Sequence, residues 1–205
     1  MKKDKKSDIK STAPEFTVEA DSDAVRHLAE GRHGDPFSIL GRHEWKQQEV
    51  FRCFLPRTTR AWLENKARPM QRLPGTDLFE CLAPAGEVAA HYHVIREVEG
   101  GGELEFTDPY SFWPQLDSGE MDAFHQGHHR YAQHMLGACP HRVDSVDGTL
   151  FSVWAPNAGR VSVIGDFNDW DGRCHPMRLH RSQGIWELFI PGISHGHYRF
   201  EIRNA

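Results

Sequence analysis

One short segment of the sequence combines an aromatic ring with polar side chains in a way that could bind a sugar. Residues 165–172 read Gly-Asp-Phe-Asn-Asp-Trp-Asp-Gly. The apolar C–H face of a pyranose ring can stack on an indole such as that of Trp170, while the Asn168 amide and the neighbouring carboxylates can hydrogen-bond hydroxyl groups. Alternatively, Trp170 folds back and closes one end of its domain. The pattern alone leaves both interpretations open.

The same segment carries three carboxylates, Asp166, Asp169 and Asp171. Cleavage or transfer at a glycosidic bond needs two carboxylates poised across that bond, one of them with a raised pKa. Asp and Asn in a turn-rich segment more commonly hydrogen-bond the local backbone. We therefore expect structural roles for these three residues and assign no catalytic residue. The sequence also contains no nucleophile elbow, phosphate-binding loop or dinucleotide-binding loop.

The fourteen histidines raise the question of a metal site. His91 and His93 would share one face of a strand and could chelate a metal ion, or they could line an exposed sheet. Structural zinc sites usually combine His with Cys at close spacing, and catalytic zinc sites need supporting carboxylates. We therefore expect neither a metal ion nor a cofactor. A further group of histidines lies in one short stretch: His125, His128, His129, His134 and His141.

The composition argues against several classes of partner. A formal net charge of −5 is unfavourable for binding nucleic acid or an anionic membrane. The basic run near the amino terminus is poor in apolar residues, so residues 1–20 are predicted to be a disordered tail. No stretch approaches the roughly 18–20 apolar residues of a membrane span, and no secretory signal is evident. Four widely spaced cysteines favour reduced thiols in the cytoplasm.

Short strands are expected to position these residues. In residues 198–203, large apolar side chains alternate with charged ones, which is typical of a half-buried strand. Residues 150–155, 160–164 and 185–190 form similar runs that end in turn residues. No helices are interleaved with these strands, and this order predicts an all-β sandwich of antiparallel sheets.

Two short helices are predicted outside the strands. Asp21 or Ser22 can cap the first helix, which stops at Gly31. Ser118 is a possible cap for the second helix, which lies further along the chain.

Four blocks of sequence recur about 100 residues later and in the same order, which predicts one fold present twice. The fold class is therefore two tandem immunoglobulin-like β-sandwiches with short connecting helices. The matching blocks are 50–60 with 150–160, 69–73 with 176–179, 78–82 with 185–189, and 91–96 with 197–203. The predicted divisions are a tail at 1–20, a first module at 21–110, a connector at 111–139 and a second module at 140–205.

The second copy closely resembles the glycogen-binding module of bacterial glycogen-branching enzymes, which belongs to carbohydrate-binding module family 48. The resemblance rests on residues 150–158, 161–172, 175–177 and 184–192. Similar modules occur in isoamylases and in the AMP-activated kinase β subunit. The first copy, which opens with His33-Gly-Asp-Pro-Phe-Ser-Ile-Leu-Gly41, resembles the additional amino-terminal module of these enzymes. Motifs at 108–112 and 136–138 match the connector of the family.

This resemblance implies a role in glycogen biosynthesis. The parent enzymes transfer an α-1,4-glucan segment to an α-1,6 branch point. Their catalytic (β/α)₈ barrel would follow this segment, and no position here matches its catalytic residues, so the chain by itself is expected to be inactive. The implied partners are glycogen or another α-glucan and, in the parent enzyme, the catalytic barrel of the same chain.

The resemblance also bears on single residues and on the completeness of the second module. Of the family's carbohydrate contacts, only Trp170 and, less directly, Asn168 can be carried over, and Arg173 has no such support. The family continues beyond residue 203 with a turn and another strand, so the second sandwich is expected to be incomplete, with an unpaired sheet edge. The first module has no counterpart of the 165–172 segment, which suggests a spacer or docking role.

Two other functions are compatible with the sequence. The chain could be a stand-alone scaffold that binds a protein partner through a sandwich face, since a fold does not fix a function. It could also be a truncated product without a function of its own.

Overall fold

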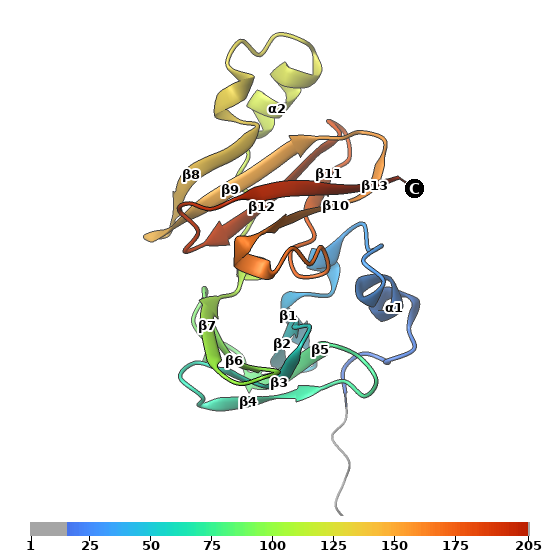
Figure 1. Ribbon diagram of the computed structural model, residues 1–205, viewed down its shortest axis with the longest axis vertical. Helices are drawn as coiled ribbons and strands as arrows, with labels where there is room; N and C mark the ends of the chain where they lie inside the picture. The colour runs from blue at the N-terminus through green and yellow to red at the C-terminus, as the bar shows by residue number, and fades with distance from the viewer. Residues whose placement is uncertain (1–15, 205) are drawn as a thin grey trace, which may run out of the picture.

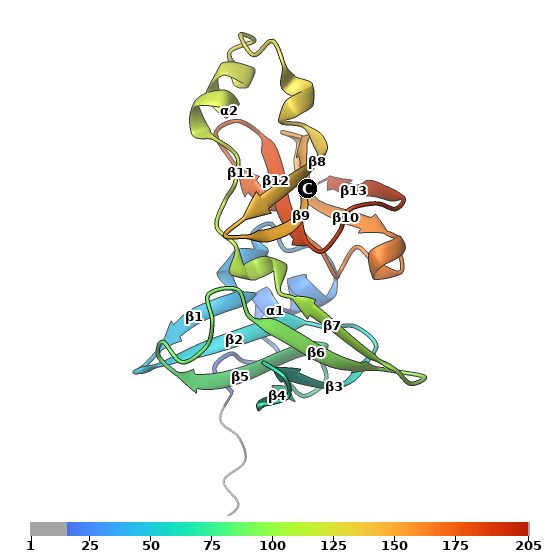
Figure 2. The same cartoon turned by 90° about the vertical axis from the view of Figure 1, so that its left-hand side faces the viewer.

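The computed structural model describes residues 16–204, and strands make up most of their regular structure (Figures 1 and 2). We call residues 36–111, which contain β1–β7, the first module and residues 137–204, which contain β8–β13, the second module. The strands of the first module are β1 (Gly41–Trp45), β2 (Gln48–Phe54), β3 (Thr58–Leu63), β4 (Arg68–Arg72), β5 (Leu78–Pro84), β6 (His93–Val98) and β7 (Glu103–Thr107). Those of the second are β8 (Gly137–Val143), β9 (Val146–Trp154), β10 (Ala158–Gly165), β11 (Arg178–His180), β12 (Ile185–Pro191) and β13 (Tyr198–Asn204).

The helices are short, as the sequence predicts. They are α1 (Asp23–Ala29), α2 (Ser118–His125) and the 3-10 turns η1 (Pro36–Ser38), η2 (Pro109–Ser111), η3 (Ala132–His134) and η4 (Asp166–Asn168). Ser22 caps α1, because its side chain accepts a hydrogen bond from the Val25 N–H. The prediction for α2 was wrong by one residue. Asp117 is the cap, with its side chain accepting from the Glu120 N–H, and Ser118 is already helical.

The two modules share a pattern of antiparallel strand pairs. The first module forms one sheet in the order β1-β2-β5-β4-β3-β6-β7, which curls so that side chains from both halves meet in one core. The second module opposes a sheet of order β11-β12-β9-β8 to the pair β10-β13. An all-β fold of sandwich modules is therefore confirmed.

The repeated blocks of sequence occupy equivalent strands. The pair β2–β5 corresponds to β9–β12, and β3–β6 corresponds to β10–β13. Both β3 and β10 carry a register shift at the same place, between Thr58 and Arg60 and between Ala158 and Arg160. Bulges of this kind are conserved within a fold, so their recurrence at equivalent positions supports the prediction that one fold is present twice.

The modules differ at one sheet edge. Strand β6 pairs with both β3 and β7, whereas its counterpart β13 pairs only with β10 within residues 16–204. The outward-facing Ile202 on β13 is 49% exposed. The described part of the second module thus has the open edge that was predicted from the sequence.

One apolar cluster joins the two modules. It includes Leu28 from α1 and Leu40 and Leu78 from the first module, together with Phe151 and Trp186 from the second, all of them buried. Figure 1 shows α1 and the segment leading to β1 lying beside the lower side of the second module. Because these side chains leave water together, the modules are held as one packed unit.

Residues 16–20 correct the predicted extent of the tail. Thr17 donates through its backbone N–H and its hydroxyl to the buried Glu80 carboxylate, at 2.8 and 2.6 Å, and accepts from Arg52. Phe16 and Val18 pack against the shared cluster. These residues therefore belong to the folded unit, because they complete a buried ion pair. The rest of the predicted tail, 1–15, lies outside the described residues.

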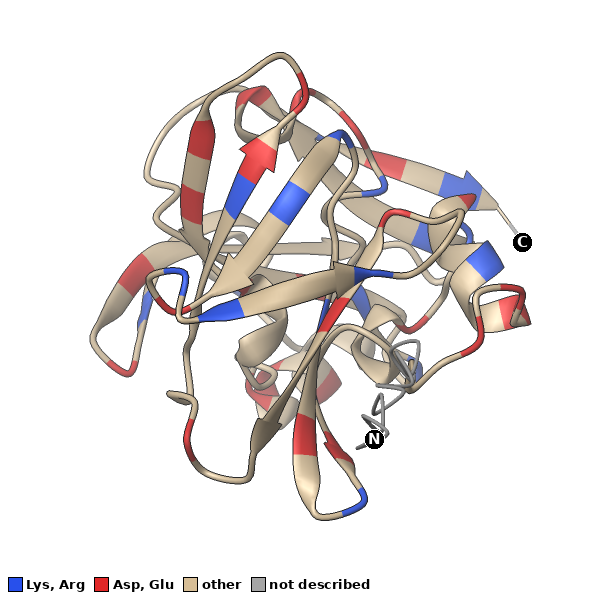
Figure 3. Cartoon of the chain, turned by 90° about the horizontal axis from the view of Figure 1, so that it is seen from below, with Lys and Arg blue, Asp and Glu red and all other residues tan. Residues whose placement is uncertain are grey.

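The surface carries charges of both signs. Figure 3 shows acidic and basic residues interspersed over the strands and loops seen from below. Among residues 16–204, none of the helices has the length and apolar character needed to cross a membrane.

Candidate functional site

The segment singled out in the sequence forms a loop between β10 and β11. It begins with η4 and lies against the start of β13. At Gly165 a Cβ atom would lie only 2.4 Å from the His197 carbonyl oxygen, so this approach of backbone to backbone requires glycine. The loop is thus held close to the sheet from its first residue.

Asn168 lies inside the loop and holds it closed. Its side-chain oxygen accepts from the Gly165 N–H at 2.9 Å. Its amide nitrogen donates to the Val163 carbonyl at 2.9 Å and to Nδ1 of His175 at 2.8 Å. Burial, with a smaller effect of Arg96, lowers the pKa of His175 to about 4, so the imidazole is neutral and can accept this bond. The structure therefore places Asn168 where it positions the loop.

Trp170 stands at the outer side of the loop. Its side chain is 41% exposed, and the guanidinium carbon of Arg199 lies 5.9 Å from the ring centroid. Both Asp169 and Trp170 have left-handed backbones, with φ of 53° and 60°. For residues other than glycine this conformation costs about 1 kcal/mol or more each, and such strain tends to collect at functional sites.

All three carboxylates make structural bonds. Asp166 accepts from the His197 N–H at 3.0 Å, and bonds from His197 lower the pKa of Asp166. Burial raises the pKa of Asp171, but hydrogen bonds from Arg173 outweigh this effect and leave that pKa below its usual value. Asp169 forms an ion pair with Arg57 of the first module. Neither Asp166 nor Asp171 thus has the raised pKa that a general acid requires.

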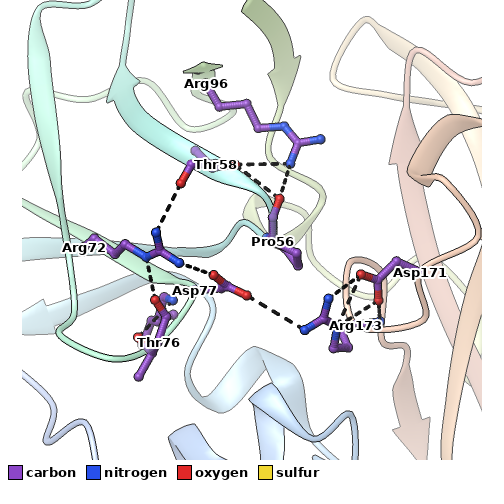
Figure 4. A network of polar contacts seen from close by, with 9 residues as sticks. Pro56, Thr58, Arg72, Thr76, Asp77, Arg96, Asp171 and Arg173 are labelled. Carbon is purple, nitrogen blue, oxygen red and sulfur yellow. Dashed lines mark hydrogen bonds and ion pairs between the residues drawn. The ribbon is translucent and has the colours of Figure 1, made fainter. Parts of the chain in front are cut away.

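The first module supports the loop from the other side. Arg57, in the turn between β2 and β3, forms an ion pair with Asp169. Figure 4 shows Arg173 between two carboxylates: its Nη2 lies 2.7 Å from Asp171, and its Nη1 lies 3.8 Å from Asp77 of the first module. Asp77 is itself fixed by Arg72. Two bridges from the first module thus reach residues on either side of Trp170.

A buried arginine anchors the end of the loop. Arg160 on β10 donates to the Gly172 carbonyl at 2.7 Å and pairs with Glu201 on β13. Burial lowers the pKa of Arg160 to about 10, which still leaves the guanidinium charged at neutral pH. The loop is therefore fastened at its start, its middle and its end.

Sequence reasoning missed these supports. Arg57 and Asp77 lie about 100 positions from the loop, in turns whose local sequence carries no sign of a distant partner. The histidines also have local roles: His91 stacks on Phe112 with ring centroids 3.9 Å apart, and its Nε2 lies 2.9 Å from Asp144. Within residues 16–204, no group of three or more His, Cys, Asp or Glu side chains is placed to hold a metal ion.

Comparisons with known proteins match both halves of the chain. Residues 21–110 match the family model described as the N-terminal domain of alpha-1,4-glucan branching enzyme GlgB. Residues 135–205 match the model of carbohydrate-binding module 48, also described as the isoamylase N-terminal domain.

Curated relatives similar to this chain are 1,4-alpha-glucan branching enzymes. The protein of Methylococcus capsulatus is 44% identical over 180 residues, which cover 87% of this chain and 24% of the relative. That of Cellvibrio japonicus is 44% identical over 183 residues, covering 84% and 25%. One from Xanthomonas axonopodis pv. citri is 43% identical over 188 residues, covering 89% and 25%. The chain thus spans about a quarter of the length of these relatives.

Proposed function

The chain belongs to the glycogen-branching enzyme family and contains that family's N-terminal domain and a carbohydrate-binding module of family 48. We propose that it binds α-glucan through the Trp170 loop. In this proposal the pyranose face of one glucose unit stacks on the indole. Asn168 contributes by positioning the loop.

The conformation of Trp170 is the observation that carries the proposal. Two consecutive residues adopt a costly backbone, and the result is an aromatic ring that remains 41% exposed. The Arg57–Asp169 and Arg173–Asp77 bridges hold the backbone on each side of the ring. A platform that is already rigid loses little entropy when a ligand binds, which favours recognition by a small contact area.

The expected affinity is weak. A single aromatic platform contributes about 1–3 kcal/mol, by analogy with bases that stack on aromatic side chains. Glycogen presents many chain ends at once, so binding to the polymer gains from multivalency even when each contact is weak. The first module acts as a support for the loop in this proposal.

In a longer protein that continues as the relatives do, this region would hold the glucan near a catalytic domain of the same chain. The reaction served would be the branching of a 1,4-α-glucan, which the names of the relatives indicate. The family resemblance implies that this proceeds by transfer of an α-1,4-glucan segment to an α-1,6 branch point. We keep the cytoplasm as the proposed compartment.

Affinity electrophoresis of the purified chain in native gels that contain glycogen tests the proposal. We expect glycogen to retard the chain and Trp170→Ala to abolish the retardation. Trp154→Ala is the matched control, because Trp154 is also exposed but lies on β9 and outside the loop. Unretarded migration of a folded chain would remove the glucan-binding function. Retardation that survives Trp170→Ala would move the site elsewhere.

A further inference from the structure

A groove lies where the two modules meet, and its lining does not include the Trp170 loop. Its volume is about 260 Å³. This is slightly below the roughly 300–1,000 Å³ of pockets that take drug-sized ligands, so the groove has room for one ring. Its lining includes Phe37 from the segment before β1, Trp113 after η2, Asp144 in the β8–β9 turn and Arg178 on β11. Both modules therefore contribute to the groove.

Trp113 is displayed on the rim of this groove. Its side chain is 83% exposed, although the chain on either side is anchored. Phe112 is buried next to it, and the N–H groups of Gln115 and Leu116 donate to the Glu187 carboxylate at 2.9 to 3.2 Å. An indole held in water by fixed neighbours offers a flat face at little further entropic cost.

Arg178 brings hydrogen-bond donors to the same groove. Its guanidinium carbon lies 3.6 Å from the ring centroid of Phe37. Within residues 16–204 its side-chain N–H groups donate to no protein acceptor. Burial lowers the pKa of this guanidinium, and the charges of Glu187 and Asp35 offset part of that effect. No nitrogen of Arg178 is among the buried polar atoms that lack a partner, so its N–H groups reach solvent and can donate to a ligand oxygen in the groove.

Asp144 determines which chemistry fits. Its side chain is 76% exposed, and its Oδ2 lies 2.9 Å from Nε2 of His91. A carboxylate beside the groove disfavours an anion, while Arg178 disfavours a cation. A neutral polyol suits both, because each hydroxyl can donate to the carboxylate and accept from the guanidinium.

We propose that this groove is a second carbohydrate subsite, which takes one glucose unit of an α-glucan with its ring on Trp113 and its hydroxyls on Arg178 and Asp144. The inference rests on the proposed glucan-binding function, since it names the same class of ligand. Residues of both modules complete the subsite, so it exists only in the joined pair.

The test follows the six Trp indole N–H signals in NMR spectra of the ¹⁵N-labelled chain during titration with maltotriose. Trp113→Phe and Trp170→Phe assign the two signals of interest. We expect both to shift in the wild type. In Arg178→Gln, the Trp113 response is expected to need about 5- to 10-fold more maltotriose while the Trp170 response is unchanged. Tyr131→Ala, which removes an exposed aromatic ring outside the groove, is the control and should alter neither response.

The outcomes separate the two proposals. A shift at Trp170 alone overturns the groove subsite and leaves the loop site standing. A shift at Trp113 alone overturns the loop site and supports sugar binding at the groove. If neither signal shifts in a well-folded sample, both the groove subsite and the loop site are overturned. An unchanged Trp113 response in Arg178→Gln also overturns the groove geometry, and the same spectra show whether that variant is folded.

Discussion

Arg57 forms an ion pair with Asp169, although 112 positions separate them in the sequence. Both residues have left-handed backbones, with φ of 56° and 53°. The contact therefore joins a tight turn of the first module to the residue directly before Trp170. Through it the first module fixes the backbone from which the proposed glucan platform projects.

Loss of the indole should abolish glucan binding while the chain stays folded. Trp170 is 41% exposed, so Trp170→Ala loses the burial of only part of the indole and should lower the free energy of unfolding by about 2 kcal/mol, less than the roughly 3–5 kcal/mol of a fully buried aromatic side chain. Urea denaturation and glycogen retardation should be measured on the same samples. A large loss of stability would indicate instead that the ring closes the end of the sandwich.

Removal of Arg57 should affect binding more than folding. The Arg57–Asp169 pair is exposed, with 53% and 64% of the two side chains accessible, so it contributes about 0–1 kcal/mol to stability. Arg57→Ala should nevertheless weaken glycogen retardation several-fold, because the loop backbone loses a support. Arg142→Ala breaks a comparable exposed pair with Asp147 and should leave retardation unchanged. Equal effects of both variants would rule out a specific role for Arg57.

Substitution of Asn168 should lower the stability of the chain in a thermal melting experiment. Asn168→Ala leaves the buried Gly165 N–H and Val163 carbonyl without partners and should cost about 2–3 kcal/mol. Binding should fall together with stability. If Asn168→Ala remains as stable as the wild type but loses glucan, the amide contacts the sugar directly.

Acid should weaken the loop through His175. Its pKa is about 4 in the folded chain against 6.5 for the free side chain, so the unfolded state binds the proton more readily. The stability contributed by the neutral His175 is fully present above pH 6.5. It is lost as the pH falls towards 4, and the total loss is at most about 3 kcal/mol.

Asp108 acts in the opposite sense, because burial raises its pKa to about 6 and acid therefore favours its folded form. The two effects overlap, so wild-type melting alone does not separate them. The difference in unfolding free energy between wild type and His175→Gln should shrink between pH 7 and pH 4.5. A difference that stays constant would contradict the low pKa of His175.

Much of the fold could be predicted because its signals are local. Alternating side chains, turn residues and the repeated blocks located the strands, and Ser22 was one of the two caps predicted for α1. The cap of α2 was misplaced because Asp117 and Ser118 are both good caps, and only geometry decides between them. The contribution of Thr17 escaped notice because its partners, Arg52 and Glu80, are distant in sequence.

The candidate site was only half predictable. Trp170 and its loop were recognised from residue types, and the structure adds where they lie. The supports from Arg57 and Asp77, and the groove at Trp113, arise from contacts between distant turns. No periodicity or motif encodes such contacts, so they follow from the way the two modules pack.

The two equivalent strand pairs have different connections, and this difference separates the roles of the two copies in the proposed function. Between β3 and β4 the chain turns within residues 64–67, whereas between β10 and β11 it runs through 166–177 and carries the loop. In the proposed function the two copies therefore have different roles: the second displays the aromatic platform, and the first supports it. Ligand recognition then depends on residues of both copies, and a substitution such as Arg57→Ala in the first copy would appear as a binding defect of the second.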